Sequence, residues 1–231
     1  MDDIAITIDS GDFEIYLLPG VYEVLISHDG YLPIDLSNNS YEIFSEINMG
    51  EFVLFSGNTV LVTDTLSSFS HWTDDYIYSV VGDVYLSSGD SLLIDPGVVV
   101  QFMENHIFWI DGILVGNGTA SDSITFTSGR LDPNQGDWPG LDFSSGGSEL
   151  SYVNILYAGG SGAIHMNGGG NLALSNSTIT NTGASGVRTE YSSNIYIDNC
   201  EFYNNSGNGI HNYRGFAQIT NSIIRNNDSD G

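Results

Sequence analysis

The stretch that decides the fold is LALSNSTITN at residues 172–181, because the chain repeats its pattern twice more. It aligns with IYIDNCEFYN at residues 195–204 and with AQITNSIIRN at residues 217–226. The three segments begin at 172, 195 and 217, so they are 23 and then 22 residues apart. Short apolar strands at this period, separated by asparagine and glycine turns, predict the coils of a parallel β-helix.

A second motif recurs between these segments. Gly140-Leu141-Asp142, Ala163-Ile164-His165, Gly186-Val187-Arg188 and Gly209-Ile210-His211 follow one another at 23-residue steps. Each coil must bury the same positions against its neighbours, so equivalent apolar residues should stack at about 4.8 Å. The predicted inward columns are Leu174, Ile197 and Ile219; Ile179, Phe202 and Ile224; and Leu141, Ile164, Val187 and Ile210.

Asparagines occupy the predicted corners between the strands. Asn tolerates a left-handed backbone and bonds the next coil through its side chain. We therefore expect two asparagine ladders, Asn176–Asn199–Asn221 and Asn181–Asn204–Asn226. A leucine-rich repeat is excluded, because its leucine consensus and its helical segment are missing.

The chain is expected to contain three segments. Residues 1–55 alternate like antiparallel strands, and the stretch 18–33 resembles the closing half of a carboxypeptidase-regulatory-like or PEGA-type β-sandwich. Residues 56–75 are predicted to form a linker and an N-terminal cap, in which Trp72 covers the first coil. Residues 76–231 form the predicted β-helix, which we expect to be truncated because the chain ends inside the repeating pattern.

Residues 82–231 resemble the right-handed parallel β-helix repeat proteins of the pectate-lyase-like superfamily. The resemblance is carried by LIDPGVVVQF at 93–102, GILVGNGT at 112–119, ITFTS at 124–128 and GDWPGL at 136–141. It implies an all-β right-handed solenoid with coils of about 22–25 residues. It does not imply one activity, because the superfamily contains lyases, hydrolases, adhesins and other surface proteins.

The charge of the chain limits its possible partners, and its single cysteine limits the role of that thiol. The chain has 29 acidic residues against four basic ones, all arginine, and a formal net charge of −25. This excludes nucleic acid and anionic membrane surfaces, and it permits divalent cations, cationic partners and neutral glycans. No apolar run approaches the about 20 residues that span a bilayer. Cys200 is the single cysteine, and its apolar–polar surroundings predict a buried structural thiol.

An outward polar column is the best candidate site. The residue after each inward one in the 23-residue motif should point outward, which places Asp142, His165, Arg188 and His211 in one solvent-facing column. The next outward positions are Ser144, Asn167, Glu190 and Tyr213. The ligand-binding candidates are Asp142, His165, Arg188, Glu190, His211, Tyr213, Arg214 and Trp138. Three interpretations stay open: a solvated polar face, a sugar-binding strip, or acid–base machinery. Trp138 is either a sugar-stacking platform or a residue packed over a loop.

No catalytic residue is assigned. The lyases of the superfamily use lysine and arginine clusters with an acidic calcium site, whereas this chain has no lysine. Polygalacturonase-type hydrolases use paired aspartates, and Asp198 is alone on another wall. Calcium is the ion that the carboxylates favour, with suggestive stretches at 9–12 and 228–231. His165 and His211 lie two coils apart, about 10 Å, which is too far to share a zinc ion.

The sequence therefore favours a non-catalytic extracellular surface or adhesin-type module, structural or glycan-binding, that contacts carbohydrate or other surface proteins. Its export signal would lie outside the chain, since Met1-Asp2-Asp3 is acidic where a signal is basic. One alternative is a polysaccharide lyase or glycoside hydrolase that acts on the outward face. The other is a filament or appendage subunit that assembles through its coil ends.

Overall fold

The computed structural model describes residues 20–22, 25–26, 34–35, 41–43 and 57–229. The chain divides into two compact units, Met1–Gly57 and Asn58–Gly231. In the first unit, β1 (Gly20–Tyr22) pairs antiparallel with β4 (Tyr41–Ile43), and β2 (Leu25–Ile26) pairs antiparallel with β3 (Ile34–Asp35). Most of the β-sandwich segment predicted for residues 1–55 lies outside the described residues.

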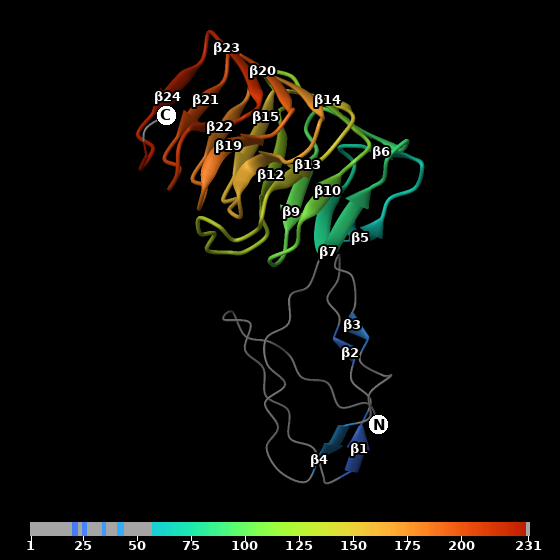
Figure 1. The fold of residues 1–231 in the computed structure, drawn as a ribbon. Coiled ribbons are helices and arrows are strands. Elements are labelled where there is room, and N and C mark those ends of the chain that lie inside the picture. Colours follow the sequence, from blue (N-terminus) through green and yellow to red (C-terminus); the bar gives the residue numbers. More distant parts are fainter. Residues whose placement is uncertain (1–19, 23–24, 27–33, 36–40, 44–56, 230–231) are drawn as a thin grey trace. The chain divides into compact units, whose positions relative to one another are not determined.

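The second unit is a parallel β-solenoid with three walls, in which strands from successive turns lie side by side (Figure 1). Wall 1 contains the first halves of β5 (Thr59–Thr65) and β7 (Ile77–Leu86), then β9 (Val99–Phe102), β12 (Ile124–Ser128), β15 (Val153–Leu156), β18 (Thr178–Thr180), β21 (Glu201–Tyr203) and β24 (Ile223–Arg225). Wall 2 contains the second halves of β5 and β7, then β10 (Phe108–Ile110), β13 (Leu141–Phe143), β16 (Gly162–Met166), β19 (Ser185–Glu190) and β22 (Ile210–Tyr213). Wall 3 contains β6 (Phe69–Trp72), β8 (Ser91–Ile94), β11 (Ile113–Asn117), β14 (Gly147–Ser151), β17 (Asn171–Ser175), β20 (Asn194–Asp198) and β23 (Phe216–Thr220). The predicted all-β parallel β-helix is confirmed.

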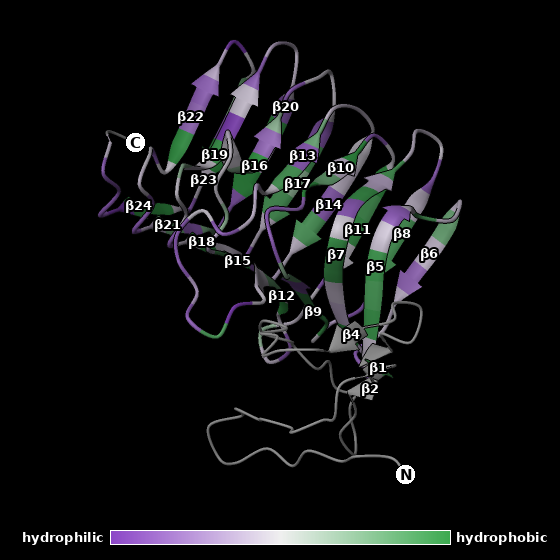
Figure 2. Cartoon of the chain, turned by 90° about the horizontal axis from the view of Figure 1, so that it is seen from below, coloured by the Kyte–Doolittle hydropathy of each residue, from purple (hydrophilic) through white to green (hydrophobic). Residues whose placement is uncertain are grey.

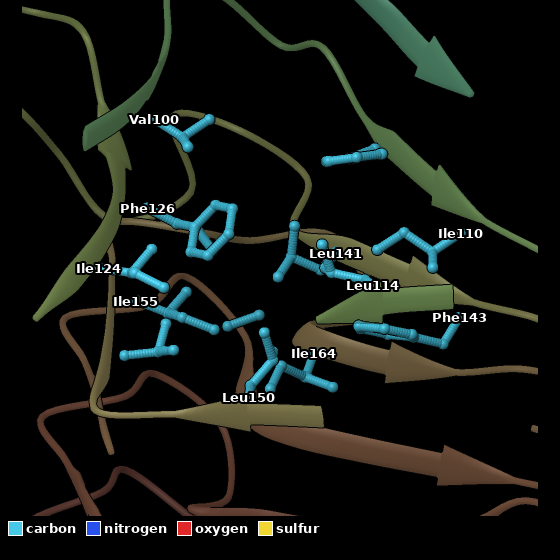
Figure 3. Packing of buried hydrophobic residues seen from close by; sticks show 14 of the residues in the cluster. Val100, Ile110, Leu114, Ile124, Phe126, Leu141, Phe143, Leu150, Ile155 and Ile164 are labelled. Carbon is cyan, nitrogen blue, oxygen red and sulfur yellow. The ribbon is translucent and has the colours of Figure 1, made fainter. Parts of the chain in front are cut away.

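The strand register confirms the three inward columns. Leu141, Ile164, Val187 and Ile210 pair in succession on wall 2, and the two other predicted columns pair in the same way on walls 3 and 1. Hydrophobic and hydrophilic residues alternate along the strands (Figure 2), as a wall with one buried face requires. Side chains from all three walls converge on one interior, with Phe126, Leu141 and Leu114 from different walls (Figure 3).

The two described ends of the solenoid differ. At the start, β5 and β6 lie within the segment 56–75 predicted as linker and cap, yet they pair in parallel with β7 and β8. Trp72 on β6 is buried and stacks on Tyr78 with ring centroids 4.5 Å apart, so it fills the first coil. In the last described coil, Ile219 and Ile224 are 43% and 38% exposed, because no further described strand covers them.

All six predicted asparagines occupy the corners, whereas a hydrogen bond between asparagine side chains of adjacent coils joins only Asn176 and Asn199 among the described residues of the two predicted ladders. Asn176, Asn181, Asn199, Asn204, Asn221 and Asn226 all have positive φ, between 51° and 56°. The Asn199 amide donates to Asn176 Oδ1 at 2.8 Å, which ties adjacent coils together. The ladder then changes partner, because Asn221 donates to Asp198 Oδ1 at 2.7 Å and not to Asn199. This exchange makes Asp198 part of the corner structure.

Two further sequence expectations can be compared with the structure. Cys200 is buried, and desolvation raises the pKa of its thiol to about 11, so the prediction of a structural thiol is confirmed. In the described part of the chain, no helix is present that has the length and hydrophobicity to cross a membrane.

Candidate ligand-binding groove on wall 2

The register of wall 2 brings the predicted column together. Asp142 pairs with His165, His165 with Arg188, and Arg188 with His211 on successive strands. The same column continues upstream through Trp109 and Tyr85, which the sequence pattern did not reveal. Residues 129–140 separate β12 from β13, and this long connection interrupts the 23-residue spacing between Trp109 and Asp142.

Asp142 departs from the expectation of a solvent-facing column, because it is only 6% exposed. Its carboxylate accepts two hydrogen bonds, from Asn167 Nδ2 to Oδ1 at 2.5 Å and from His165 Nδ1 to Oδ2 at 2.8 Å. A buried carboxylate needs such donors to offset its lost hydration. The bond from Nδ1 also orients the imidazole and leaves Nε2 as its second functional atom.

His165 and Glu190 form the next part of the cluster. His165 Nε2 is buried without a hydrogen-bond partner among the described residues, and it lies 3.7 Å from Glu190 Oε1. The Arg188 guanidinium donates to the same Oε1 from Nη2 at 2.6 Å and from Nε at 2.7 Å. This contact with Arg188 holds the pKa of Glu190 below its ordinary value. Arg188 is therefore already paired with a carboxylate.

A groove of about 300 Å³ lies beside this cluster. Trp109 borders it, as do His165 and Asn167, and the turns 139–140 and 160–162 also line it. Gly140 has φ of +114°, and a Cβ there would lie 2.5 Å from the Gly162 carbonyl oxygen. The two turns can approach this closely only because residue 140 is a glycine. The groove thus combines one aromatic ring with fixed polar groups.

The remaining candidates lie away from the groove. His211 follows Arg188 in the column but does not line the groove. Tyr213 is exposed and meets Tyr191 edge to face, with ring centroids 6.2 Å apart. The Arg214 guanidinium carbon lies 5.1 Å from the centroid of the Tyr213 ring, in a cation–π contact.

Trp138 corrects the prediction of a sugar-stacking platform. Its side chain is fully buried, stacks on Phe102 with ring centroids 3.9 Å apart, and donates from Nε1 to the Leu156 carbonyl at 2.9 Å. The alternative, that Trp138 is a packing residue, is correct. A buried ring cannot offer its face to a ligand. Trp109 is the tryptophan that borders the groove.

No group of three or more histidine, cysteine or acidic side chains is arranged to hold a metal ion within the part of the chain that the structure describes. The calcium stretch suggested at 9–12 lies outside that part, and so do the last two residues of the stretch 228–231. Calcium binding therefore stays a prediction.

Comparison with known families assigns the solenoid. The family described as a right handed beta helix region matches residues 85–231, which is more than half of the chain. The chain belongs to the right-handed β-helix family. Comparisons with curated proteins and with solved structures found no match. The family membership gives the hand of the helix and its fold, whereas the function must be argued from the site.

Proposed function

We propose that this chain is an extracellular surface module that binds neutral carbohydrate, without catalysis, in the groove on wall 2. The observation that carries the proposal is the position of Trp109 beside the Asp142–His165–Asn167 cluster in one groove. An aromatic face accepts the apolar side of a sugar ring, and fixed polar atoms accept or donate to its hydroxyls. The column of Tyr85 and Trp109 extends this surface along the helix axis.

Charge supports a neutral ligand. The net charge of −25 repels acidic polysaccharides, and the nearest cation to His165 in the column, Arg188, is paired with Glu190. A lyase must stabilise the negative charge that develops next to the substrate carboxylate, for which an unpaired cation is the usual device. Arg188 does not supply one while Glu190 holds it. Binding without bond cleavage is therefore the function that this electrostatic arrangement favours.

Isothermal titration with neutral hexasaccharides of glucose, xylose and mannose tests the proposal. Trp109→Ala should weaken binding about tenfold, since stacking on an aromatic ring contributes on the order of 1 kcal/mol. Tyr76→Ala is the matched control, because Tyr76 is exposed but does not line the groove. Equal affinities of wild type and Trp109→Ala for every sugar would contradict the proposal.

An enzyme is the second candidate, and one observation favours it. Asp142 holds His165 so that Nε2 is left without a partner, as in a general base that is oriented by a carboxylate. Incubation with uronate-containing polysaccharides, followed by the absorbance of unsaturated products, distinguishes the candidates. Product that forms with wild type and disappears with Arg188→Ala and with His165→Ala would replace the binding proposal with a lyase.

Self-association through the coil ends is a third candidate. The observation that favours it is the exposure of Ile219, Ile223 and Ile224 on the last described coil. Size-exclusion chromatography with and without calcium tests this alternative together with the predicted role of the ion. A strictly monomeric profile under both conditions would argue against assembly.

A further inference from the structure

Wall 3 contains a second depression that is independent of the groove on wall 2. It measures about 190 Å³ and lies over β17, β20 and β23. The outward side chains around it are Ala173, Ser175, Tyr196, Asp198, Gln218 and Thr220. We call this surface the wall-3 ledge.

An exposed aromatic ring, Tyr196, lines the ledge, and the ring of Phe216 packs beside it. Tyr196 is 47% exposed and Phe216 is 49% exposed, and their ring centroids lie 5.7 Å apart at an interplanar angle of 55°. Ala173 precedes Tyr196 in the same outward column, and its small side chain projects less from the wall than the ring of Tyr196 does. The Tyr196 ring therefore stands beside a shallow depression over Ala173. This shape suits a ring-shaped ligand better than a flat wall does.

Asp198 presents a fixed acceptor at the same ledge. Its Oδ1 accepts from Thr220 Oγ1 and from Asn221 Nδ2, each at 2.7 Å. These hydrogen bonds, chiefly the one from Thr220, hold the pKa of Asp198 below its ordinary value, so the carboxylate is ionised at neutral pH. Oδ2 accepts no hydrogen bond from any described residue. The carboxylate is thus oriented through one oxygen and open through the other.

Neutral polar groups complete the ledge. The amide of Gln218 and the hydroxyl groups of Ser175 and Tyr196 have no hydrogen-bond partner within the described residues. A sugar hydroxyl can donate to Asp198 Oδ2 while a neighbouring hydroxyl pairs with the Gln218 amide. Since Asp198 is the one carboxylate that lines this depression, the donor set does not suit a divalent cation.

We propose that the wall-3 ledge is a second carbohydrate-binding site, which takes one neutral sugar ring of a glycan against Tyr196 and Phe216. Asp198 Oδ2 and Gln218 bind the hydroxyls of that ring. The charge of the carboxylate selects neutral sugars over uronates, because an acidic sugar would face Asp198 at close range. With sites on two walls, one molecule binds two glycan segments, and the second attachment is strengthened by effective concentration.

Titration of single and double variants with neutral hexasaccharides of glucose, xylose and mannose tests the second site. Wild type should bind two equivalents of at least one sugar, and Trp109→Ala should weaken one class of sites about tenfold while the other keeps its wild-type affinity. Adding Tyr196→Ala to Trp109→Ala should weaken the remaining class as well, whereas adding Tyr76→Ala should not. Asp198→Asn keeps an oxygen for Thr220 and Asn221 but replaces Oδ2 with an amide, so wall-3 affinity should fall about tenfold.

The outcomes separate this inference from the function proposed for wall 2. If Trp109→Ala alone abolishes all binding, or if Tyr196→Ala and Asp198→Asn bind as wild type does, the second site is refuted. If Tyr196→Ala removes binding and Trp109→Ala changes nothing, the second site stands and the wall-2 proposal fails. Thermal melts of each variant show whether it is folded. The two residues altered on wall 3, Tyr196 and Asp198, are exposed, so their substitution should leave the fold intact.

Discussion

Walls 2 and 3 place a carboxylate at equivalent outward faces of one solenoid, yet the two carboxylates have opposite environments. Asp142 on wall 2 is buried and lines the groove together with the turns 139–140 and 160–162, and both of its oxygens accept hydrogen bonds. Asp198 on wall 3 is exposed, and one of its oxygens is open. The β-helix supplies the same strand positions on both walls, so the loops between strands decide whether a site is enclosed or open.

This difference has an energetic consequence. A buried carboxylate is stable only with its donors, which makes Asp142 a structural member of its site as well as a binding group. Asp198 is exposed and takes part in the corner through Oδ1 alone, so its Oδ2 is available to a ligand.

The largest effects are expected in the shared core. Ile164 and Ile197 point inward beneath the two sites and are both buried, so Ile164→Ala and Ile197→Ala should each destabilise the fold by about 2–5 kcal/mol. Ile219→Ala, in the half-exposed last coil, should cost clearly less. Urea unfolding followed by circular dichroism measures all three. If only one of Ile164→Ala and Ile197→Ala lowered the free energy of unfolding, the two sites would not share a common core.

Gly140 lies in a turn that lines the wall-2 groove. Gly140→Ala forces a Cβ to within 2.5 Å of the Gly162 carbonyl oxygen at φ of +114°, so the cost should reach about 3 kcal/mol. Gly147→Ala on wall 3 is the matched control, because no atom lies within 4 Å of its added Cβ. Unfolding midpoints and hexasaccharide titrations compare the two. A stable Gly140→Ala variant with an unchanged wall-2 affinity would show that the close approach of the turns does not shape the groove.

Much of the solenoid was predictable from the sequence, because parallel coils impose a strict period. The 23-residue step placed His165 above Asp142 and Arg188 above His165, and the register confirms each pair. The asparagine corners were equally predictable, since few other residues adopt positive φ so readily. The β-helix can therefore be predicted from the repeat period alone, without knowledge of side-chain packing.

The sites were less predictable, because they depend on loops that do not follow the period. The connection 129–140 hid the continuation of the column to Trp109, and it carries Trp138 into the core against Phe102. An outward position also does not imply exposure, as the burial of Asp142 shows. The open oxygen of Asp198 results from the bonds of Thr220 and Asn221, which alternation of apolar and polar residues does not reveal.

The two carboxylates give a direct test of the contrast. Asp142→Asn places an amide donor against Asn167 or His165, so it should cost about 1–3 kcal/mol of stability. Asp198→Asn keeps its acceptor oxygen at an exposed position, so it should cost clearly less stability than Asp142→Asn. Unfolding in urea at pH 7 measures both. Equal costs for the two substitutions would remove the distinction between an enclosed and an open site.

The smallest effect concerns pH and salt. The pKa of Glu190 lies below its ordinary value of 4.5, chiefly because of the hydrogen bond from Arg188. A carboxyl group with a depressed pKa stabilises the fold above its unfolded pKa, and the contribution disappears as the pH falls through the folded pKa. Wild type should therefore lose more stability than Glu190→Gln when the pH falls from 7 to about 3, as followed by urea midpoints.

High salt should reduce this difference between wild type and Glu190→Gln, because the partner of Glu190 is the charged side chain of Arg188. On wall 3 the bonds to Asp198 come from the neutral side chains of Thr220 and Asn221, so the corresponding difference between wild type and Asp198→Asn should respond less to salt. An equal salt response on both walls would show that the Arg188–Glu190 pair does not act as an ion pair.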